Sequence, residues 1–306
     1  MKKYHYRVYD LNVESDIEIP ELLKSNADDK IDVFIKYGKI PKGIIDKIPR
    51  GAWYHLEKDS FVFRVENVAK YFIKNGSAII VEPFDSANED DVRIFTLGTS
   101  FGILINQRND IAIHGGSILI NNEAVILTGD TGAGKSTLTN AFRHNGYRFL
   151  CDDVSVLDSK KEGIFVMPAY PQQKLCRDAM DKMGYDTEKF KKIDDDRDKY
   201  CIPVHDSFEK NPCKLSAICE IELVERDKDV EVKELLGQEK LFSVMRNIYR
   251  IELIRNMDMS KEYFNKCLNI AKSIRIFKVR RPKDKFTVNE QISLIEQAIS
   301  NLKIKN

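Results

Sequence analysis

The fold of this chain is decided by the stretch Gly129-Asp130-Thr131-Gly132-Ala133-Gly134-Lys135-Ser136. This stretch is a full match to the phosphate-loop pattern G-x-x-x-x-G-K-[ST], also called Walker A. An apolar run, Val125-Ile126-Leu127, enters the loop, and residues 136–144 that leave it are typical of a helix. Because the pattern requires a strand before the loop and a helix after it, the sequence predicts an α/β fold with a P-loop.

The loop predicts nucleotide binding through its backbone. Its glycines let successive N–H groups and the N-terminus of the following helix face a polyphosphate. Lys135 is expected to reach the β- and γ-phosphates of ATP, and the Ser136 hydroxyl is expected to bind Mg²⁺. The predicted nucleotide-binding residues are Gly129, Asp130, Thr131, Gly132, Ala133, Gly134, Lys135, Ser136 and Thr137.

The residues around the loop predict two parts of the chain. Residues 1–93 contain short β-branched and aromatic runs at 31–35, 61–65 and 78–81, so this part is predicted to be β-rich. The polar stretch 86–91 reads as a loop and places the boundary after residue 93. Residues 94–306 form the predicted nucleotide-binding core with C-terminal helices.

Within the core, several elements are predicted from their patterns. Apolar runs at 118–120 and 125–127 flank Asn121-Asn122, which is typical of a hairpin. Residues 92–106, 238–254 and 261–271 have helical spacing, and residues 149–157 and 215–224 read as buried strands. The very polar stretch 182–198 is predicted to be a surface loop.

Composition excludes several classes of protein. The 306 residues carry 49 basic and 48 acidic side chains, so the chain lacks the basic excess expected for nucleic-acid binding. No run approaches the 18 apolar residues that a membrane helix needs, and the first residues do not resemble a signal peptide. The six cysteines form no C-x-x-C pair, so free thiols and a cytoplasmic location are expected.

Asp152-Asp153 comes on the strand that follows the helix of the loop. A strand-borne aspartate can hold Mg²⁺, as a Walker B residue does, and a second carboxylate suits the role of proton acceptor for an attacking hydroxyl. Neighbouring side chains of a strand point to opposite faces, so both reach one site only if the strand ends or bulges there. The alternative is that one of the two is a solvated edge residue.

His114-Gly115-Gly116 follows a further apolar run, Ile111-Ala112-Ile113. An isolated histidine is more often a hydrogen-bonded structural residue than a catalyst, so His114 alone carries little functional weight.

Taken together, residues 113–118, the loop 129–136 and residues 146–154 resemble the HPr kinase/phosphorylase superfamily, whose nucleotide core is shared with phosphoenolpyruvate carboxykinase. The resemblance implies that His114 lies near the γ-phosphate or the metal, and that the two aspartates divide metal binding and base catalysis. We favour Asp153 as the base and Asp152, with Ser136, as the metal ligand. The implied catalytic residues are His114, Lys135, Asp152 and Asp153.

A second resemblance extends downstream. Residues 168–175 and 199–203 look like the stand-alone HPr-kinase-like proteins associated with ribosomally made peptides, some of which phosphorylate a serine of a lasso-peptide precursor. Lys174 and Lys199 are candidates for holding phosphate charge, the alternative being ordinary solvated lysines. Arg246 and Arg250, one helical turn apart in the predicted helix, are candidates for a phosphate clamp, the alternative being a basic helix face.

The leading hypothesis is therefore an ATP- and Mg²⁺-dependent kinase that transfers the γ-phosphate to a hydroxyl, most plausibly a serine of a peptide or protein. A small metabolite alcohol is an alternative acceptor. A nucleotide-dependent switch is the rival from another class, but the guanine motif N-K-x-D is not matched, since Asn265-Lys266-Cys267-Leu268 lacks the aspartate. The oligomeric state is open, with a homo-oligomer among the options.

Overall fold

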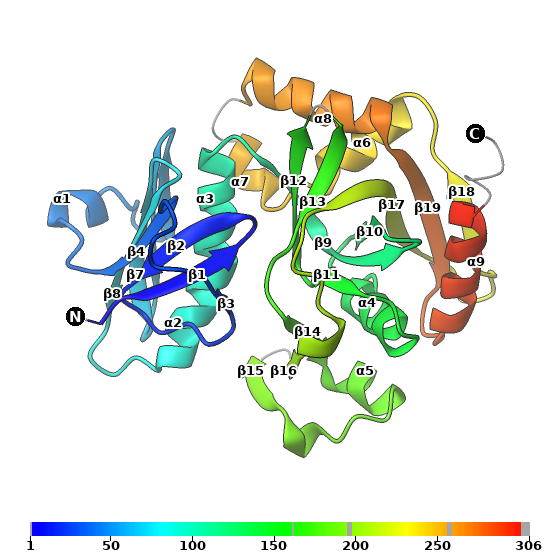
Figure 1. Ribbon diagram of the computed structural model, residues 1–306, viewed down its shortest axis with the longest axis horizontal. Helices are drawn as coiled ribbons and strands as arrows, with labels where there is room; N and C mark the ends of the chain where they lie inside the picture. The colour runs from blue at the N-terminus through cyan, green and yellow to red at the C-terminus, as the bar shows by residue number, and fades with distance from the viewer. Residues whose placement is uncertain (1, 161, 195–197, 256–258, 301–306) are drawn as a thin grey trace. The chain divides into compact units, whose positions relative to one another are not determined.

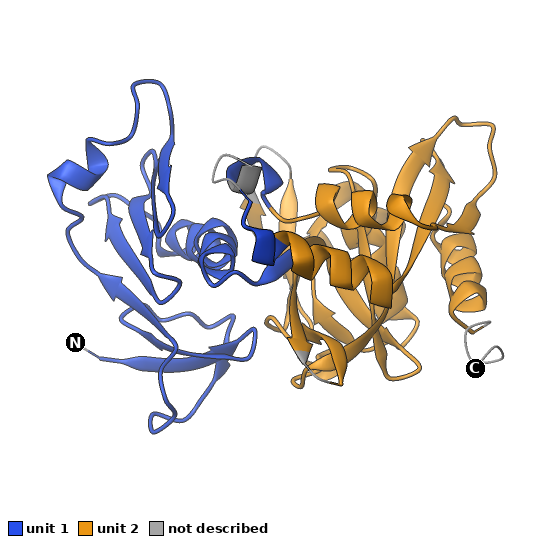
Figure 2. Ribbon diagram, turned by 90° about the horizontal axis from the view of Figure 1, so that it is seen from above, with its two compact units in different colours: residues 1–112, 250–263 blue, residues 113–249, 264–306 orange. Residues whose placement is uncertain are grey.

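A computed structural model of the chain describes residues 2–160, 162–194, 198–255 and 259–300 (Figure 1). The chain forms two compact units, one of residues 1–112 and 250–263 and the other of residues 113–249 and 264–306 (Figure 2). Both units combine strands and helices, so the predicted α/β class is confirmed. The six cysteines are free, as predicted.

The first unit is built on an eight-stranded sheet with the order β3-β1-β2-β4-β8-β7-β6-β5. The runs predicted as strands at 31–35, 61–65 and 78–81 lie in β4, β6 and β8 and are confirmed. The strands are β1 (Tyr4–Val8), β2 (Leu11–Ser15), β3 (Leu23–Lys24), β4 (Val33–Tyr37), β5 (Tyr54–Glu57), β6 (Ser60–Val65), β7 (Ala69–Lys74) and β8 (Ala78–Pro83). A short helix, α1 (Lys42–Ile45), joins β4 to β5.

Residues 89–107 form helical structure that belongs to this first unit. It consists of α2 (Glu89–Phe95), the π-helical turn η1 (Thr96–Ser100) and α3 (Phe101–Gln107), which confirms the helix predicted over 92–106. The Tyr71 hydroxyl donates to the carbonyl of Val92 at 3.1 Å, and Gln107 Nε2 donates to the carbonyl of Ile73 at 3.2 Å. Because these helices are bonded to β7, the first unit runs to Ala112 rather than ending at the predicted boundary after residue 93.

The second unit contains a sheet with the order β10-β9-β12-β13-β17-β19-β18, in which β10 also pairs with β17 and β11 pairs with β9. Its strands are β9 (Ile111–Ile120), β10 (Glu123–Gly129), β11 (Phe149–Cys151), β12 (Val154–Lys160), β13 (Gly163–Met167), β17 (Cys213–Val224), β18 (Glu231–Glu234) and β19 (Arg275–Pro282). The predicted hairpin is confirmed: β9 and β10 are antiparallel, and Asn121 and Asn122 both have positive φ, as the tight turn between them requires. β17 confirms the strand predicted over 215–224.

Three strands of this sheet, β10, β17 and β19, are parallel and carry the phosphate loop at their carboxyl ends. Their inner face packs against α4 (Lys135–His144) and α9 (Val288–Ser300). The apolar core between them includes Leu127, Leu138, Phe142, Ile221, Val279 and Ile295. Burial of these side chains fixes the start of α4 relative to the end of β10, which is the junction that the loop spans.

The strand predicted over 149–157 is interrupted. β11 ends at Cys151 and β12 begins at Val154, so Asp152 and Asp153 form a bend between two strands. The single-strand prediction is wrong because its apolar pattern continues on both sides of the aspartates. Because the strand ends at the aspartates, their side chains need not point to opposite faces, and both carboxylates can reach one site.

Two further predictions need correction. The helix expected over 238–254 is split into α6 (Gln238–Arg246) and α7 (Ile251–Arg255), because Arg250 between them has a φ of 54°. The polar stretch 182–198 is not simply a loop, since it includes η2 (Thr187–Lys189) and β15 (Lys191–Asp194); residues 195–197 lie outside the described residues. β15, β14 (Gln172–Cys176) and β16 (Lys199–Pro203) form a three-stranded sheet in the order β14-β16-β15.

The remaining elements are α5 (Arg177–Lys182), the 3₁₀ turn η3 (His205–Ser207) and α8 (Lys261–Ser273), of which α8 confirms the helix predicted over 261–271. None of the helices within the described ranges combines the length and apolar character needed to span a membrane.

The fold depends on a close approach at Gly116, which gives a testable prediction. A Cβ at this position would lie 2.6 Å from Thr139 Oγ1 of α4 and 2.8 Å from the carbonyl oxygen of Asp152. We expect Gly116→Ala to lower the free energy of unfolding by about 1–3 kcal/mol, as overpacking does. Denaturant unfolding followed by circular dichroism measures this change.

The matched control is Gly43→Ala in α1, where an added Cβ meets nothing within 4 Å. This change should leave stability unaltered or raise it slightly, by up to about 1 kcal/mol. Equal stabilities of the Gly116→Ala variant and the wild type would contradict the close packing of β9 against α4.

Candidate active site

The phosphate loop runs from the end of β10 to the start of α4. Gly129 has a φ of 135°, and a Cβ at this position would lie 2.3 Å from the carbonyl oxygen of Ile221 on the neighbouring strand. Only glycine satisfies both constraints, so the first glycine of the motif is needed by backbone conformation and by packing. Asp130 and Thr131 are exposed on the loop, while Ser136 and Thr137 are half-buried on the first turn of α4.

Lys135 is folded back onto its own loop. Its Nζ donates to the carbonyl oxygens of Gly129 at 2.9 Å and Asp130 at 3.1 Å. The side chain is only 8% exposed, and burial lowers the pKa of its ammonium group although the charge of Asp153 opposes the shift. The cation is therefore held at the loop, where its interaction with an anion is strengthened by low solvent access.

Asp152 is the buried member of the aspartate pair. Its Oδ2 accepts a hydrogen bond from the backbone N–H of Lys174 at 2.9 Å, whereas its buried Oδ1 has no hydrogen-bond partner among the described residues. Burial, followed by the negative charge of Asp153, raises the pKa of Asp152 to about 7. A buried carboxylate oxygen without a partner is costly, so this site gains from a bound cation.

Asp153 lies beside His114 and has the opposite electrostatic character. His114 Nε2 is 3.3 Å from Asp153 Oδ1. Burial works against the charged form, but the hydrogen bond from His114 and the positive charges of Lys174 and Lys199 outweigh it and lower the pKa of Asp153. Asp153 is therefore ionised at neutral pH.

The backbone of His114 is fixed by two contacts. Its N–H donates to the carbonyl of Asn247 at 2.8 Å, and its carbonyl accepts from the Thr128 hydroxyl at 2.8 Å. The imidazole contacts the ring of Tyr249 edge-on, with 5.8 Å between centroids. These contacts come from β10 and from the segment after α6, so the histidine is positioned by elements far apart in the sequence.

Lys174 and Lys199 come from the three-stranded sheet. Cys176 pairs with Lys199 in the register of β14 and β16, which places Lys174 and Lys199 on the same face of that sheet. Burial opposes protonation of Lys174, but the interaction with Tyr170 and the negative charges of Asp153 and Asp152 raise the pKa of its ammonium group. The structure therefore gathers six predicted side chains into one charged cluster: His114, Lys135, Asp152, Asp153, Lys174 and Lys199.

Tyr170 was not predicted as a site residue. Burial raises the pKa of its hydroxyl to about 12, and it interacts electrostatically with Lys174 and Asp153. The sequence alone gives little indication that Tyr170 belongs to the site, because tyrosine is common in protein interiors. The local feature that sets it apart is its place between Pro168 and Pro171.

The helical turn predicted to join Arg246 and Arg250 is wrong, because α6 ends at Arg246 and Arg250 has a φ of 54°. Arg246 forms an ion pair with Glu220 of β17. Within the first unit, Arg250 donates to Thr99 Oγ1 at 2.9 Å and lies over the ring of Trp53, 5.8 Å from its centroid.

The donors expected for Mg²⁺ are Ser136 and Asp152. No group of three or more His, Cys, Asp or Glu side chains within the described ranges could hold a metal on its own. Mg²⁺ commonly uses one or two carboxylates together with phosphate oxygens and water, and the unpartnered Oδ1 of Asp152 is a suitable ligand. The residues present therefore fit a Mg²⁺ ion that arrives with a nucleotide.

No family model matches the chain, and no curated protein shows significant sequence similarity to it. Among solved structures, the chain is similar to the Hpr(Ser) kinase/phosphatase from Coxiella burnetii, at 16% identity, over 63% of this chain and 97% of that chain, with a TM-score of 0.34. A likeness of this extent defines neither a shared activity nor a shared substrate, so the functional conclusion depends on the site itself.

The raised pKa of Asp152 predicts how stability changes with pH. In the unfolded chain the pKa of aspartate is about 3.9, so between about pH 4 and pH 7 the folded protein binds this proton more tightly. Stability is therefore lost as the pH rises through this window. We expect Asp152→Asn, which removes the charge, to be more stable than the wild type by about 2–4 kcal/mol at pH 8, and the difference to vanish near pH 4.

Chemical denaturation across this pH range, without nucleotide or divalent metal, measures the difference. The control is Asp227→Asn, which changes an exposed aspartate of the same unit and should leave the pH profile as it is. A constant offset between the wild type and Asp152→Asn at all pH values would show that Asp152 is not protonated preferentially in the fold.

Proposed function

We propose that this protein is a kinase that transfers the γ-phosphate of ATP to a hydroxyl group in the presence of Mg²⁺. The observation that carries the proposal is the aspartate pair beside the phosphate loop, in which Asp153 Oδ1 lies 3.3 Å from His114 Nε2. In the same pair a buried oxygen of Asp152 has no hydrogen-bond partner among the described residues. Asp153 is thus suited to accept a proton from a hydroxyl group, and Asp152 is suited to bind a cation.

The roles of the side chains follow from their positions. The loop N–H groups and Lys135 bind the phosphates of the nucleotide. Asp153 accepts a hydrogen bond from the acceptor hydroxyl, orients its oxygen toward the γ-phosphorus and takes its proton as the new P–O bond forms. The bond between the γ-phosphorus and the bridging oxygen of the β-phosphate breaks in the same step, and ADP leaves. His114 holds the Asp153 carboxylate in place and keeps it ionised.

Ser136 and Asp152 are the residues that would hold Mg²⁺, which neutralises negative charge developing on the transferred phosphoryl group. Lys174 and Lys199 add two positive charges close to Asp153. These cations would stabilise the negative charge that spreads over the oxygen atoms of the transferred group in the transition state. Electrostatic stabilisation of this kind is the dominant form of catalysis in phosphoryl transfer.

The acceptor class rests on the resemblance of residues 168–175 and 199–203 to stand-alone peptide serine kinases. These residues surround Lys174 and Lys199, which lie next to Asp153. We therefore propose a serine of a peptide or protein as acceptor, ahead of a metabolite alcohol.

The experiment that tests the proposed activity uses γ-labelled ATP, Mg²⁺ and cell extract separated into metabolites, peptides and proteins, with Lys135→Ala as the blank. We expect label to enter the peptide or protein fraction as phosphoserine. Label confined to a metabolite would replace the acceptor class and keep the chemistry. Release of free phosphate alone, from every fraction, would contradict a kinase and favour a nucleotide-dependent switch.

The base assignment predicts separable effects on transfer and binding. Asp153→Asn should lower the transfer rate by about 10²–10⁴-fold, since the amide cannot accept the proton, while the affinity for the nucleotide stays within a few fold. Lys135→Ala should abolish both, because it removes the cation at the phosphates. Steady-state rates and equilibrium binding measure the two quantities, and transfer by Asp153→Asn at near the wild-type rate would refute its role as base.

A further inference from the structure

A hollow adjoins the phosphate loop on the side of β17. It consists of two neighbouring cavities of about 280 and 250 Å³ that share Glu222, Arg246 and Lys278. The first cavity reaches the loop itself, at Asp130 and Ala133. Cavities of this size are close to the range of small-ligand sites, about 300–1,000 Å³.

The order of the strands in the sheet shows where this hollow lies relative to the proposed site. β10, which carries the loop, lies between β9 on one side and β17 on the other. His114 is on β9, whereas Glu220 and Glu222 of the hollow are on β17. A triphosphate on the loop whose terminal phosphate points toward His114 would extend its other end toward β17. That end would lie outside the carboxyl ends of the parallel strands, where ligands of such sheets commonly bind.

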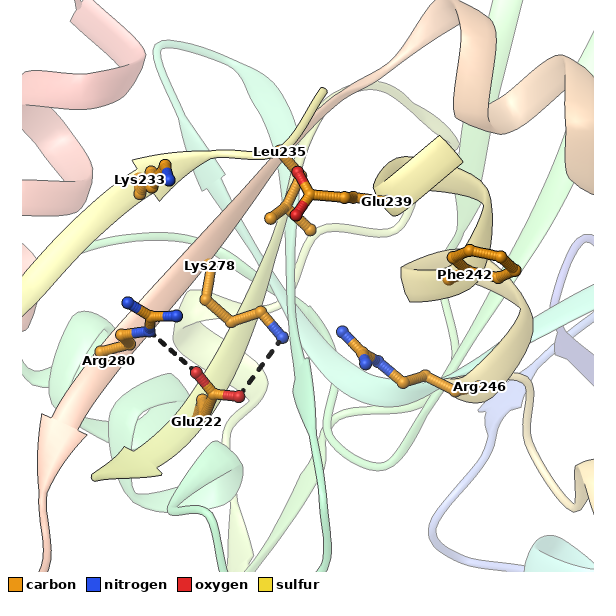
Figure 3. A pocket seen from close by; sticks show the side chains of 8 residues that line it. All are labelled: Glu222, Lys233, Leu235, Glu239, Phe242, Arg246, Lys278 and Arg280. Carbon is orange, nitrogen blue, oxygen red and sulfur yellow. Dashed lines mark hydrogen bonds and ion pairs between the residues drawn. The ribbon is translucent and has the colours of Figure 1, made fainter. Parts of the chain in front are cut away.

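Arg246 stands between the loop and the rest of the hollow. It forms an ion pair with the buried Glu220 and interacts electrostatically with Asp130 of the loop. Lys278 also contacts Glu220, at 3.0 Å. The charged ends of Lys278 and Arg246 point toward each other (Figure 3), and both residues line the cavity that reaches Asp130 and Ala133 of the loop. Two cations at this place are suited to the phosphate nearest the ribose.

Farther from the loop, the hollow has an aromatic wall. The ring of Phe242 on α6 is 59% exposed and lines this part of the hollow together with the buried Leu235 (Figure 3). Glu239 lines the same part with a carboxylate, and Glu222 is held by Arg280 at 2.9 Å. The apolar ring is bordered by the carboxylate of Glu239 and by the cations Lys233 and Arg280, so it offers a stacking surface with acceptors and donors around it. A base and a ribose are recognised by this combination.

We propose that this hollow binds the nucleoside part of the nucleotide, with the base stacked on Phe242 and the ribose near Glu222 and Arg246. The inference rests on the proposed function, because it requires a nucleotide whose phosphates occupy the loop. It assigns a ligand to residues of α6, β17 and β19 that take no part in the transfer step.

The test compares two ligands that share their phosphates. Dissociation constants for Mg-ATP and Mg-tripolyphosphate are measured for the wild type, Phe242→Ala, Phe242→Tyr and Leu236→Ala. Phe242→Ala should weaken ATP binding by about 5- to 100-fold and leave tripolyphosphate binding unchanged, while Phe242→Tyr keeps the stacking surface and restores ATP binding. Leu236 is exposed and lines neither cavity, so Leu236→Ala should change neither constant.

The outcomes separate this inference from the proposed function. Wild-type protein that binds ATP and tripolyphosphate, with Phe242→Ala binding ATP equally well, overturns the nucleoside site alone. An unchanged ATP affinity combined with a raised KM for the acceptor also overturns it, since the hollow would then hold the acceptor. Wild-type protein that binds neither ligand overturns the proposed nucleotide function itself.

Discussion

The candidate site depends on how closely β9 passes between α4 and the bend at Asp152-Asp153. Gly116 lies against Thr139 of α4 and against the backbone of Asp152, where no larger residue fits. Directly before it, a Cβ on Gly115 would lie 2.4 Å from the carbonyl oxygen of Leu127 on β10, and the N–H of Gly115 donates to the carbonyl of Asp153 at 3.0 Å. The absence of two side chains thus brings three distant segments of sequence together: the one with His114, the phosphate loop, and the aspartate pair.

Charge balance is the second constraint. A pair of neighbouring carboxylates in a partly buried position is tolerated only if cations or protons compensate it. His114, Lys174 and Lys199 stabilise the charge of Asp153, whereas Asp152 receives one backbone hydrogen bond and has a pKa of about 7. This asymmetry gives the two aspartates different chemical uses. It comes from the burial of Asp152 and from the hydrogen bond of His114 and the charges of the two lysines that act on Asp153.

Much of the core could be predicted from local sequence. The loop, the hairpin around Asn121-Asn122 and the helix that follows the loop carry strong local signals, namely glycines, turn residues and apolar periodicity. The break at Asp152-Asp153 could not be predicted with the same certainty, because apolar residues of strand character continue on both sides of it. The left-handed conformation of Arg250, which ends the expected long helix, also leaves no mark in the pattern.

Tertiary packing produces three features that local sequence does not reveal. They are the convergence of Lys174 and Lys199 on Asp153, the position of Tyr170, and the hollow beside Phe242. The resemblance suggested the two lysines but gave no reason for them to meet, and it gave no role to Phe242 or Tyr170. The boundary between the units was predicted too early for the same reason, since the hydrogen bonds from Tyr71 and Gln107 join residues far apart in sequence.

The central claim is that the phosphate loop and the His114–aspartate cluster form one phosphoryl-transfer site. A crystal structure of the protein with Mg²⁺ and a non-hydrolysable ATP analogue tests it most directly. We expect the terminal phosphate to contact Lys135 Nζ and to be directed toward Asp153 and His114, with the metal on Ser136 and Asp152. A nucleotide bound away from the loop, or a terminal phosphate directed away from both aspartates, would contradict it.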